Sequence, residues 1–108
     1  MQFIRGTTPT IVVTVQTELD LHQVAEVWIY ISQDGAVKVD KKIADVEFDY
    51  ELRTMTLTLS QEDTLALNDG GALIQIRVLL LDGTALATYA SSVEVGAIYK
   101  DGVITAGG

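Results

Sequence analysis

Residues 53–87 restrict the fold more than any other part of this sequence. Residues 54–59, TMTLTL, alternate polar and apolar side chains, which is the period of a half-buried strand. Residues 60–63, SQED, place a hydroxyl at a candidate N-cap and a carboxylate three positions later, so we expect a short helical turn near residues 61–66. Residues 72–81, ALIQIRVLLL, form the strongest strand pattern, and an Asp-Gly pair then turns the chain into residues 84–87. This order of elements is typical of the last third of an immunoglobulin-like sandwich.

The rest of the chain adds further short strands separated by turn signals. The patterns lie at residues 10–17, 25–33, 36–40 and 45–49, with weaker ones at 2–5 and 88–95. Within residues 25–33, Val27, Ile29 and Ile31 share one face, and Asp34-Gly35 then predicts a hairpin. Val37 and Val39 are expected to point inward on the return strand. We therefore predict an all-β, immunoglobulin-like antiparallel β-sandwich of about seven strands.

The domain organisation follows from the length and from the distribution of these patterns. At 108 residues the chain is long enough for one hydrophobic core, and no linker or internal repeat interrupts it. We assign residues 1–96 to a single sandwich domain and residues 97–108 to a C-terminal tail. In that tail Asp101-Gly102 could close one small hairpin, and the final Ala-Gly-Gly is expected to fray.

The charge balance excludes several classes of partner. The chain carries 15 acidic and 7 basic residues, a net charge of -8, whereas nucleic acids and anionic membrane surfaces bind clustered lysine and arginine. There is no cysteine, so disulfides, thiolate metal sites and thiol catalysis are excluded. The first residues do not show the basic and apolar regions of a signal peptide, and no apolar run is long enough for a membrane span. We therefore expect synthesis in the cytoplasm, with no nucleic acid or membrane partner.

Catalytic and metal-binding signatures are missing from the sequence. The single histidine, His22, stands in a polar turn beside Asp20 with no further ligand or triad partner at a useful spacing. The serines have no G-x-S-x-G context, and no phosphate-binding glycine loop occurs. We interpret the protein as non-enzymatic, with no cofactor and no metal site, and a small-molecule ligand is not expected. An enzyme remains the least favoured class.

Four carboxylates alternate with apolar residues on one predicted strand: Asp45, Glu47, Asp49 and Glu51. Such a row could attract Ca²⁺, but calcium sites usually gather their oxygen ligands around a loop. A flat acidic row more often protects the edge of a sheet from the addition of another strand. We therefore interpret these residues as an acidic edge that keeps the protein soluble.

One group of residues indicates a binding surface. On strand alternation Trp28 and Tyr30 point away from the apolar face of their strand, and in a sandwich that strand neighbours residues 72–81. The candidate interaction face consists of Trp28, Tyr30, Gln75, Arg77 and Leu79. Tryptophan, tyrosine and arginine are the types enriched at protein interfaces. Two alternatives stay open, namely that the protein's own tail or N-terminus covers this face, or that Trp28 faces the core as in true immunoglobulin domains.

Several segments also resemble a known group of proteins. The matching segments are residues 4–10 (IRGTTPT), 27–29 (VWI), 32–35 (SQDG), 59–65 (LSQEDTL), 75–79 (QIRVL) and 82–85 (DGTA). Together they resemble short β-sandwich proteins encoded in phages and prophages of Gram-positive bacteria, and they are similar to the N-terminal domain of phage baseplate upper proteins. The resemblance implies a structural module of a tail or baseplate, with no catalytic signature. The baseplate proteins continue into a long region after this domain, whereas this sequence stops at Gly108.

Two functional hypotheses follow. The first is a non-enzymatic phage or prophage structural module that binds other virion or tail proteins, itself, or both, and that is made in the host cytoplasm and becomes virion-associated. The alternative is a small binding module for a carbohydrate or a peptide, in which Trp28 and Tyr30 form the stacking surface.

Overall fold

The computed structural model describes residues 1–15, 19–88 and 90–106. In these residues the chain forms nine strands, one short α-helix and two 3-10 turns. The strands are β1 (Gln2–Ile4), β2 (Thr10–Thr14), β3 (Val24–Gln33), β4 (Ala36–Lys42), β5 (Val46–Asp49), β6 (Thr54–Thr58), β7 (Gly70–Leu80), β8 (Ala85–Ala87) and β9 (Ser91–Gly96). The helical elements are η1 (Leu21–Gln23), η2 (Ile43–Asp45) and α1 (Gln61–Leu65).

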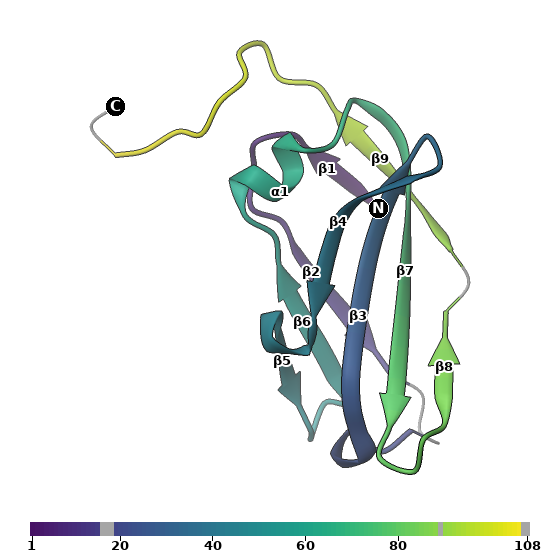
Figure 1. Ribbon diagram of the computed structural model, residues 1–108. Helices are drawn as coiled ribbons and strands as arrows, with labels where there is room; N and C mark the ends of the chain where they lie inside the picture. Colours follow the sequence, from purple (N-terminus) through teal and green to yellow (C-terminus); the bar gives the residue numbers. More distant parts are fainter. Residues whose placement is uncertain (16–18, 89, 107–108) are drawn as a thin grey trace.

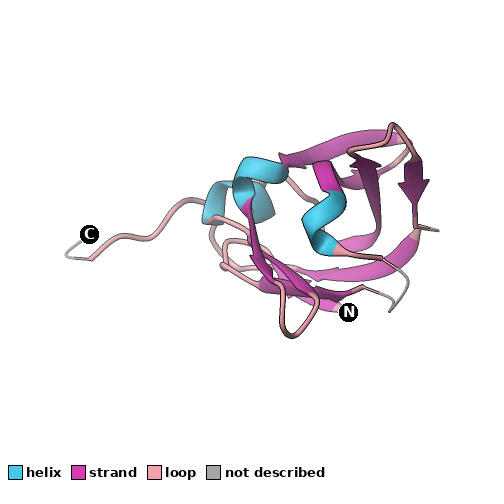
Figure 2. Cartoon of the chain, turned by 90° about the horizontal axis from the view of Figure 1, so that it is seen from below, coloured by secondary structure: helices cyan, strands magenta, loops and turns pink. Residues whose placement is uncertain are grey.

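The strands form two sheets that face each other, which confirms the predicted all-β sandwich (Figures 1 and 2). The larger sheet has the order β1-β9-β7-β3-β4, with β8 pairing with β7, and the smaller sheet has the order β2-β6-β5. The count exceeds the expected seven because β1 is a separate strand and because the segment after the Asp82-Gly83 turn divides into β8 and β9 along the same edge of β7. One pair departs from the antiparallel pattern, since β1 runs parallel to β9.

The core consists of the inward-facing side chains of both sheets. On β3, Val27, Ile29 and Ile31 are 0–1% exposed, as their alternation predicts. They face the smaller sheet, whose Leu57 is also fully buried. The other predicted core residues are buried too: Leu59, Ile74, Ile76 and Val78.

The return strand β4 differs from the prediction at one position. Asp34 and Gly35 have φ angles of 52° and 78°, so the predicted hairpin turn is formed. Val39 is buried, but Val37 is 58% exposed, so the expectation that it points inward is wrong. The register between β3 and β4 shifts after Ile31, where Ser32 lies opposite Val37. An irregularity of this kind reverses the face on which the following side chains lie.

Helix α1 begins where the capping pattern predicts. The hydroxyl of Ser60 accepts a hydrogen bond from the backbone N–H of Asp63 at 3.1 Å, and the carboxylate of Asp63 accepts one from the backbone N–H of Ser60 at 2.8 Å. The same carboxylate lies 2.9 Å from Nζ of Lys41, which reaches it from β4. Burial by itself would raise the pKa of Asp63, but the hydrogen bonds from Ser60 and the ammonium of Lys41 outweigh it and hold that pKa below its ordinary value.

The substitution Asp63→Asn tests this cap. At neutral pH we expect it to lower the free energy of unfolding by about 1 kcal/mol, because it removes a charge from the first turn and from Lys41. The Asp63 carboxylate contributes its full stabilisation above about pH 4, close to the pKa of an aspartate in the unfolded chain. This stabilisation is lost as the pH falls through the lower pKa of Asp63 in the folded protein. Urea unfolding at pH 7 and at pH 2.5 measures both limits, and Asp69→Asn at an exposed loop position is the control. An equal loss at both pH values would contradict this account.

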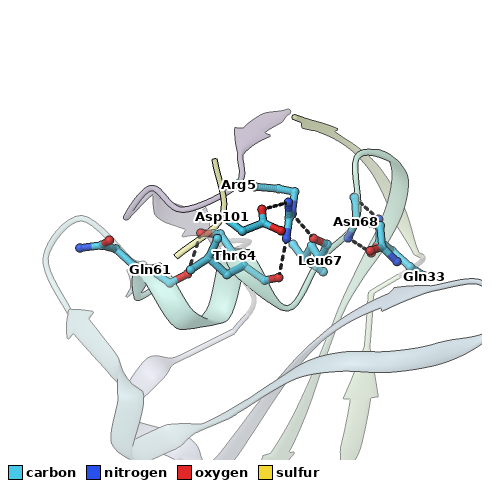
Figure 3. Close-up of polar contacts among 8 residues, drawn as sticks. Arg5, Gln33, Gln61, Thr64, Leu67, Asn68 and Asp101 are labelled. Atoms are coloured by element: carbon cyan, nitrogen blue, oxygen red, sulfur yellow. Dashed lines mark hydrogen bonds and ion pairs between the residues drawn. The ribbon is translucent and has the colours of Figure 1, made fainter. Parts of the chain in front are cut away.

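The polar contacts in Figure 3 join the N-terminal segment, α1 and the tail. Arg5 donates hydrogen bonds to the carbonyl oxygens of Leu65 and Leu67, at the end of α1, and it forms an ion pair with Asp101 at 2.6 Å. Gln61 bonds both the N–H and the carbonyl of Ile104. Residues 97–106 contain no strand, so the small hairpin considered for this tail is not formed, and side-chain contacts fix its position instead.

A buried amide connects the far end of β3 to the loop before β7. Gln33 is 5% exposed. Its Nε2 donates to the carbonyl oxygen of Asn68 at 2.7 Å, and its Oε1 accepts from the backbone N–H of Asn68 at 2.7 Å (Figure 3). Nε2 also approaches the carbonyl oxygen of Gly71 at 3.4 Å. A single buried side chain therefore pairs with both backbone polar groups of Asn68, in a loop whose residues 68–71 are exposed.

Candidate interaction face

The five residues of the predicted face lie together on the outer side of the larger sheet. Strands β3 and β7 pair antiparallel, which places Trp28 opposite Arg77 and Tyr30 opposite Gln75, while Leu79 lies opposite Glu26. Arg77 is exposed, and the other four predicted side chains are half-buried. The hydrophobic core contains neither Trp28 nor Tyr30, so the alternative in which Trp28 fills the core does not describe this fold. In Figure 1, β3 and β7 lie in front of the smaller sheet.

The surface between these side chains is slightly hollowed. A depression of about 360 Å³ is lined by Trp28, Tyr30, Arg77, Leu79 and neighbouring atoms of Val78 and Ala85. Gln75 is already engaged, because its Nε2 donates to the carbonyl oxygen of Thr88 at 2.9 Å. Trp28, Tyr30, Arg77 and Leu79 are therefore the members of the predicted face that are most available to a partner.

Strand register adds neighbours that the sequence analysis did not place on this face. On β4, Lys42 lies opposite Trp28 and Asp40 lies opposite Tyr30. On β7, Leu73 is 47% exposed and lies opposite Ser32. We call the enlarged surface the outer face; its members are Glu26, Trp28, Tyr30, Ser32, Val37, Asp40, Lys42, Leu73, Gln75, Arg77 and Leu79.

The outer face differs from the whole chain in its charge. It carries two carboxylates, Glu26 and Asp40, and two cations, Lys42 and Arg77, so its net charge is zero, whereas the whole chain has a net charge of -8. In the described residues, ion pairs within 4 Å join only Arg5 to Asp101 and Lys41 to Asp63. The four charged groups of the outer face are therefore not paired with one another at that distance.

The predicted acidic row is only partly a strand feature, because Asp45 lies in η2 and Glu51 lies in the turn after β5. Glu47 and Asp49 belong to β5, an edge strand of the smaller sheet. Asp45 accepts a hydrogen bond from the backbone N–H of Lys42, and Asp49 accepts one from that of Leu52. These two carboxylates therefore stabilise local turns. Residues 1–15, 19–88 and 90–106 contain no group of three or more histidine, cysteine, aspartate or glutamate side chains that could hold a metal ion.

His22 lies on the surface near the end of the smaller sheet. Its backbone N–H donates to the carboxylate of Asp20, which caps η1, and its ring stacks on Tyr50 with a centroid distance of 4.1 Å and an interplanar angle of 3°. The ring therefore has a packing role. A second hollow of about 340 Å³ lies between the sheets and is mostly apolar, with Met55, Ile76 and Leu86 among its lining residues. No titratable side chain lines it.

The fold defines the class of the protein, an all-β sandwich of two facing sheets. No family model matches the sequence, and no curated protein sequence matches it significantly. Among solved structures the chain is similar to CopC from Methylosinus trichosporium OB3b, with a TM-score of 0.55 over 93% of this chain and 87% of that one. The two sequences are 16% identical, so the likeness shows a common sandwich fold alone. No helix in the described part of the chain is long and apolar enough to cross a membrane.

Proposed function

We propose that this protein is a non-enzymatic protein-interaction module and that it serves as a structural component of a phage or prophage tail or baseplate. The observation that carries the interaction function is the outer face, on which aromatic, aliphatic and arginine side chains from two neighbouring strands meet. The phage assignment is supported by the sequence resemblance to phage and prophage β-sandwich proteins.

The physical argument for binding rests on composition and exposure. Leaving apolar surface in water costs about 25 cal/mol per Å², and a wide apolar patch on a monomer usually has a partner. Trp28, Tyr30 and Leu79, which are half-buried, and Leu73, which is 47% exposed, contribute apolar surface to this face, and the exposed Arg77 supplies donors for polar contacts. Aromatic and arginine side chains in the middle of a contact contribute most of its binding energy.

The double substitution Trp28→Ala with Arg77→Glu tests this function. We expect the wild-type chain to copurify with phage particles released from its own bacterium, and we expect the double variant to be reduced at least tenfold in those particles. Quantitative mass spectrometry of gradient-purified particles measures both. Val12→Ala with Arg53→Glu, at exposed positions away from the outer face, is the matched control. Absence of the wild-type chain from the particles would overturn the phage assignment, and normal incorporation of the double variant would overturn the role of the face.

The depression over Trp28 and Tyr30 favours one further candidate, a carbohydrate or peptide ligand. Its volume of about 360 Å³ is within the range of small-ligand sites, and aromatic rings are suitable stacking surfaces for sugars. Trp28 is the only tryptophan, so its fluorescence reports directly on this site. Saturable fluorescence changes with a defined oligosaccharide or peptide would favour this candidate over a protein partner.

A further inference from the structure

We propose that the outer face binds the same face of a second copy of this chain, with the two larger sheets packed face to face about a two-fold axis. This inference rests on the proposed interaction function and adds the identity of the partner and the geometry of the contact. The axis lies in the plane between the sheets, runs across the strands, and passes between Trp28 and Tyr30.

The strand register arranges the outer face in four rows across the sheet. The first row contains Glu26 and Leu79; the second contains Lys42, Trp28 and Arg77; the third contains Asp40, Tyr30 and Gln75; the fourth contains Val37, Ser32 and Leu73. The proposed rotation exchanges the second row with the third and the first with the fourth. A two-fold contact of this kind is self-complementary, because every pairing occurs twice.

Each pairing that the rotation creates joins compatible groups. Lys42 faces Asp40 of the second copy, and Asp40 in turn faces Lys42 of the second copy. Both residues are exposed, and neither has an ion pair within 4 Å in the described residues. Trp28 faces Tyr30 of the second copy, which stacks aromatic surface in the centre of the contact.

The ends of the face also match. The rotation places Leu73, which is 47% exposed, opposite Leu79 of the second copy. Glu26 faces the hydroxyl of Ser32, which can donate a hydrogen bond to it. Arg77 faces the amide of Gln75, whose oxygen can accept one. The aromatic pairs therefore lie at the centre of the contact, on β3, and the leucine pairs lie near the two ends of β7.

The charges select this axis over the other two-fold arrangement. A two-fold axis parallel to the strands would keep each row in place and would put β4 opposite β8. Lys42 would then face Ala87, which lies in the same row as Arg77, and the charges on β4 would lose their partners. The crosswise axis instead pairs both β4 charges of each copy.

The neutral charge of the outer face also favours a second copy as the occupant. Two chains of net charge -8 repel each other over most of their surfaces. The outer face has as many cations as carboxylates, so two copies can meet there with little local repulsion. A strongly basic partner would be expected to select an acidic surface such as the β5 edge instead.

Single charge reversals on β4 provide the test. Asp40→Lys places two lysines opposite each other at both contacts, and Lys42→Asp places two aspartates there. We expect sedimentation velocity to show a wild-type dimer, and we expect each single variant to be at least tenfold weaker in association. An equimolar mixture of the two variants should dimerise like the wild type, because the lysines of one chain then face the aspartates of the other. The double variant carrying both substitutions should also recover.

Cross-linking gives an independent reading of the geometry. The sequence contains no cysteine, so introduced thiols are the only targets for a thiol-specific cross-linker. Leu73 and Leu79 are six residues apart on β7, about 20 Å, which is too far for a short bismaleimide to join within one copy. Facing sheets lie about 10 Å apart, which such a reagent spans. Leu73→Cys mixed with Leu79→Cys should cross-link, and neither variant alone should.

Three results would overturn the inference: a wild-type chain that stays monomeric at millimolar concentration, charge variants that dimerise as strongly as the wild type, or a mixture that fails to recover. Each leaves the proposed function separately testable, because incorporation of the chain into particles does not require a dimer in solution. Loss of incorporation by the Trp28 and Arg77 double variant, together with a monomeric wild type, would assign the face to a different tail protein.

Discussion

Replacing Ile29 by alanine is expected to lower the free energy of unfolding by about 4 kcal/mol, the upper part of the range for a large-to-small change in a closely packed core. Ile29 is 1% exposed at the centre of β3, the strand between β4 and β7 in the larger sheet. The substitution removes apolar contacts and leaves a cavity that the neighbouring strands cannot close, because each is fixed by pairing on the sheet. For a domain of this size the melting temperature should fall by roughly 15–30 °C.

The matched control is the same chemical change on the surface. Ile104 is 75% exposed in the tail, and only its backbone groups bond to Gln61. Ile104→Ala should therefore change the free energy of unfolding by no more than about 0.5 kcal/mol. Thermal and urea unfolding followed by circular dichroism compare the two variants. A loss below 1 kcal/mol for Ile29→Ala would show that β3 is not at the centre of the core.

Replacing Gln33 by glutamate is expected to cost roughly 3 kcal/mol at pH 7, although the side chain keeps its size and shape. The amide nitrogen of Gln33 donates to the carbonyl oxygen of Asn68 at 2.7 Å, and a carboxylate puts a second acceptor in that position. The site is 5% exposed, so water cannot compensate the negative charge. Gln23→Glu at an exposed position of η1 is the control.

The stability lost in Gln33→Glu should become smaller as the pH falls. Burial and the two carbonyl oxygens of Asn68 and Gly71 raise the folded-state pKa of a glutamate placed here above its unfolded value of about 4.3. The folded variant then binds more protons than the unfolded chain, so its stability relative to the wild type falls as the pH rises through this interval. Below about pH 4 the protonated acid donates to the carbonyl oxygen, and most of the stability should return. A pH-independent loss would rule out this explanation.

The local patterns in the sequence predicted most of the sandwich. Alternation placed Val27, Ile29 and Ile31 in the core, and the capping pattern at Ser60 and Asp63 placed α1, because each signal depends on residues close together in the chain. Val37 was misplaced, since the irregularity opposite Ser32 arises from pairing between strands and leaves no mark in the sequence. The parallel pairing of β1 with β9 was missed for the same reason.

The candidate face was predicted in part. Alternation supplied Trp28, Tyr30, Gln75, Arg77 and Leu79, because one strand pairing was enough to bring them together. Asp40, Lys42 and Leu73 became neighbours only through the observed register. The contacts of Arg5 and Gln33 were not predicted, since most of their partners are backbone carbonyl oxygens far along the chain, which every residue type provides.

The parallel pairing of β1 with β9 has a consequence for how the protein matures in the cell. Gln2 lies opposite Glu94, so the first strand of the described chain pairs with the last one, which is synthesised about 90 residues later. At roughly 5–20 residues per second, the nascent chain spends several seconds with Phe3 lacking its β9 partner strand. The larger sheet can be completed only after synthesis has passed β9. We therefore expect the domain to fold only after β9 has left the ribosome, at the slow rates of proteins dominated by contacts between distant residues.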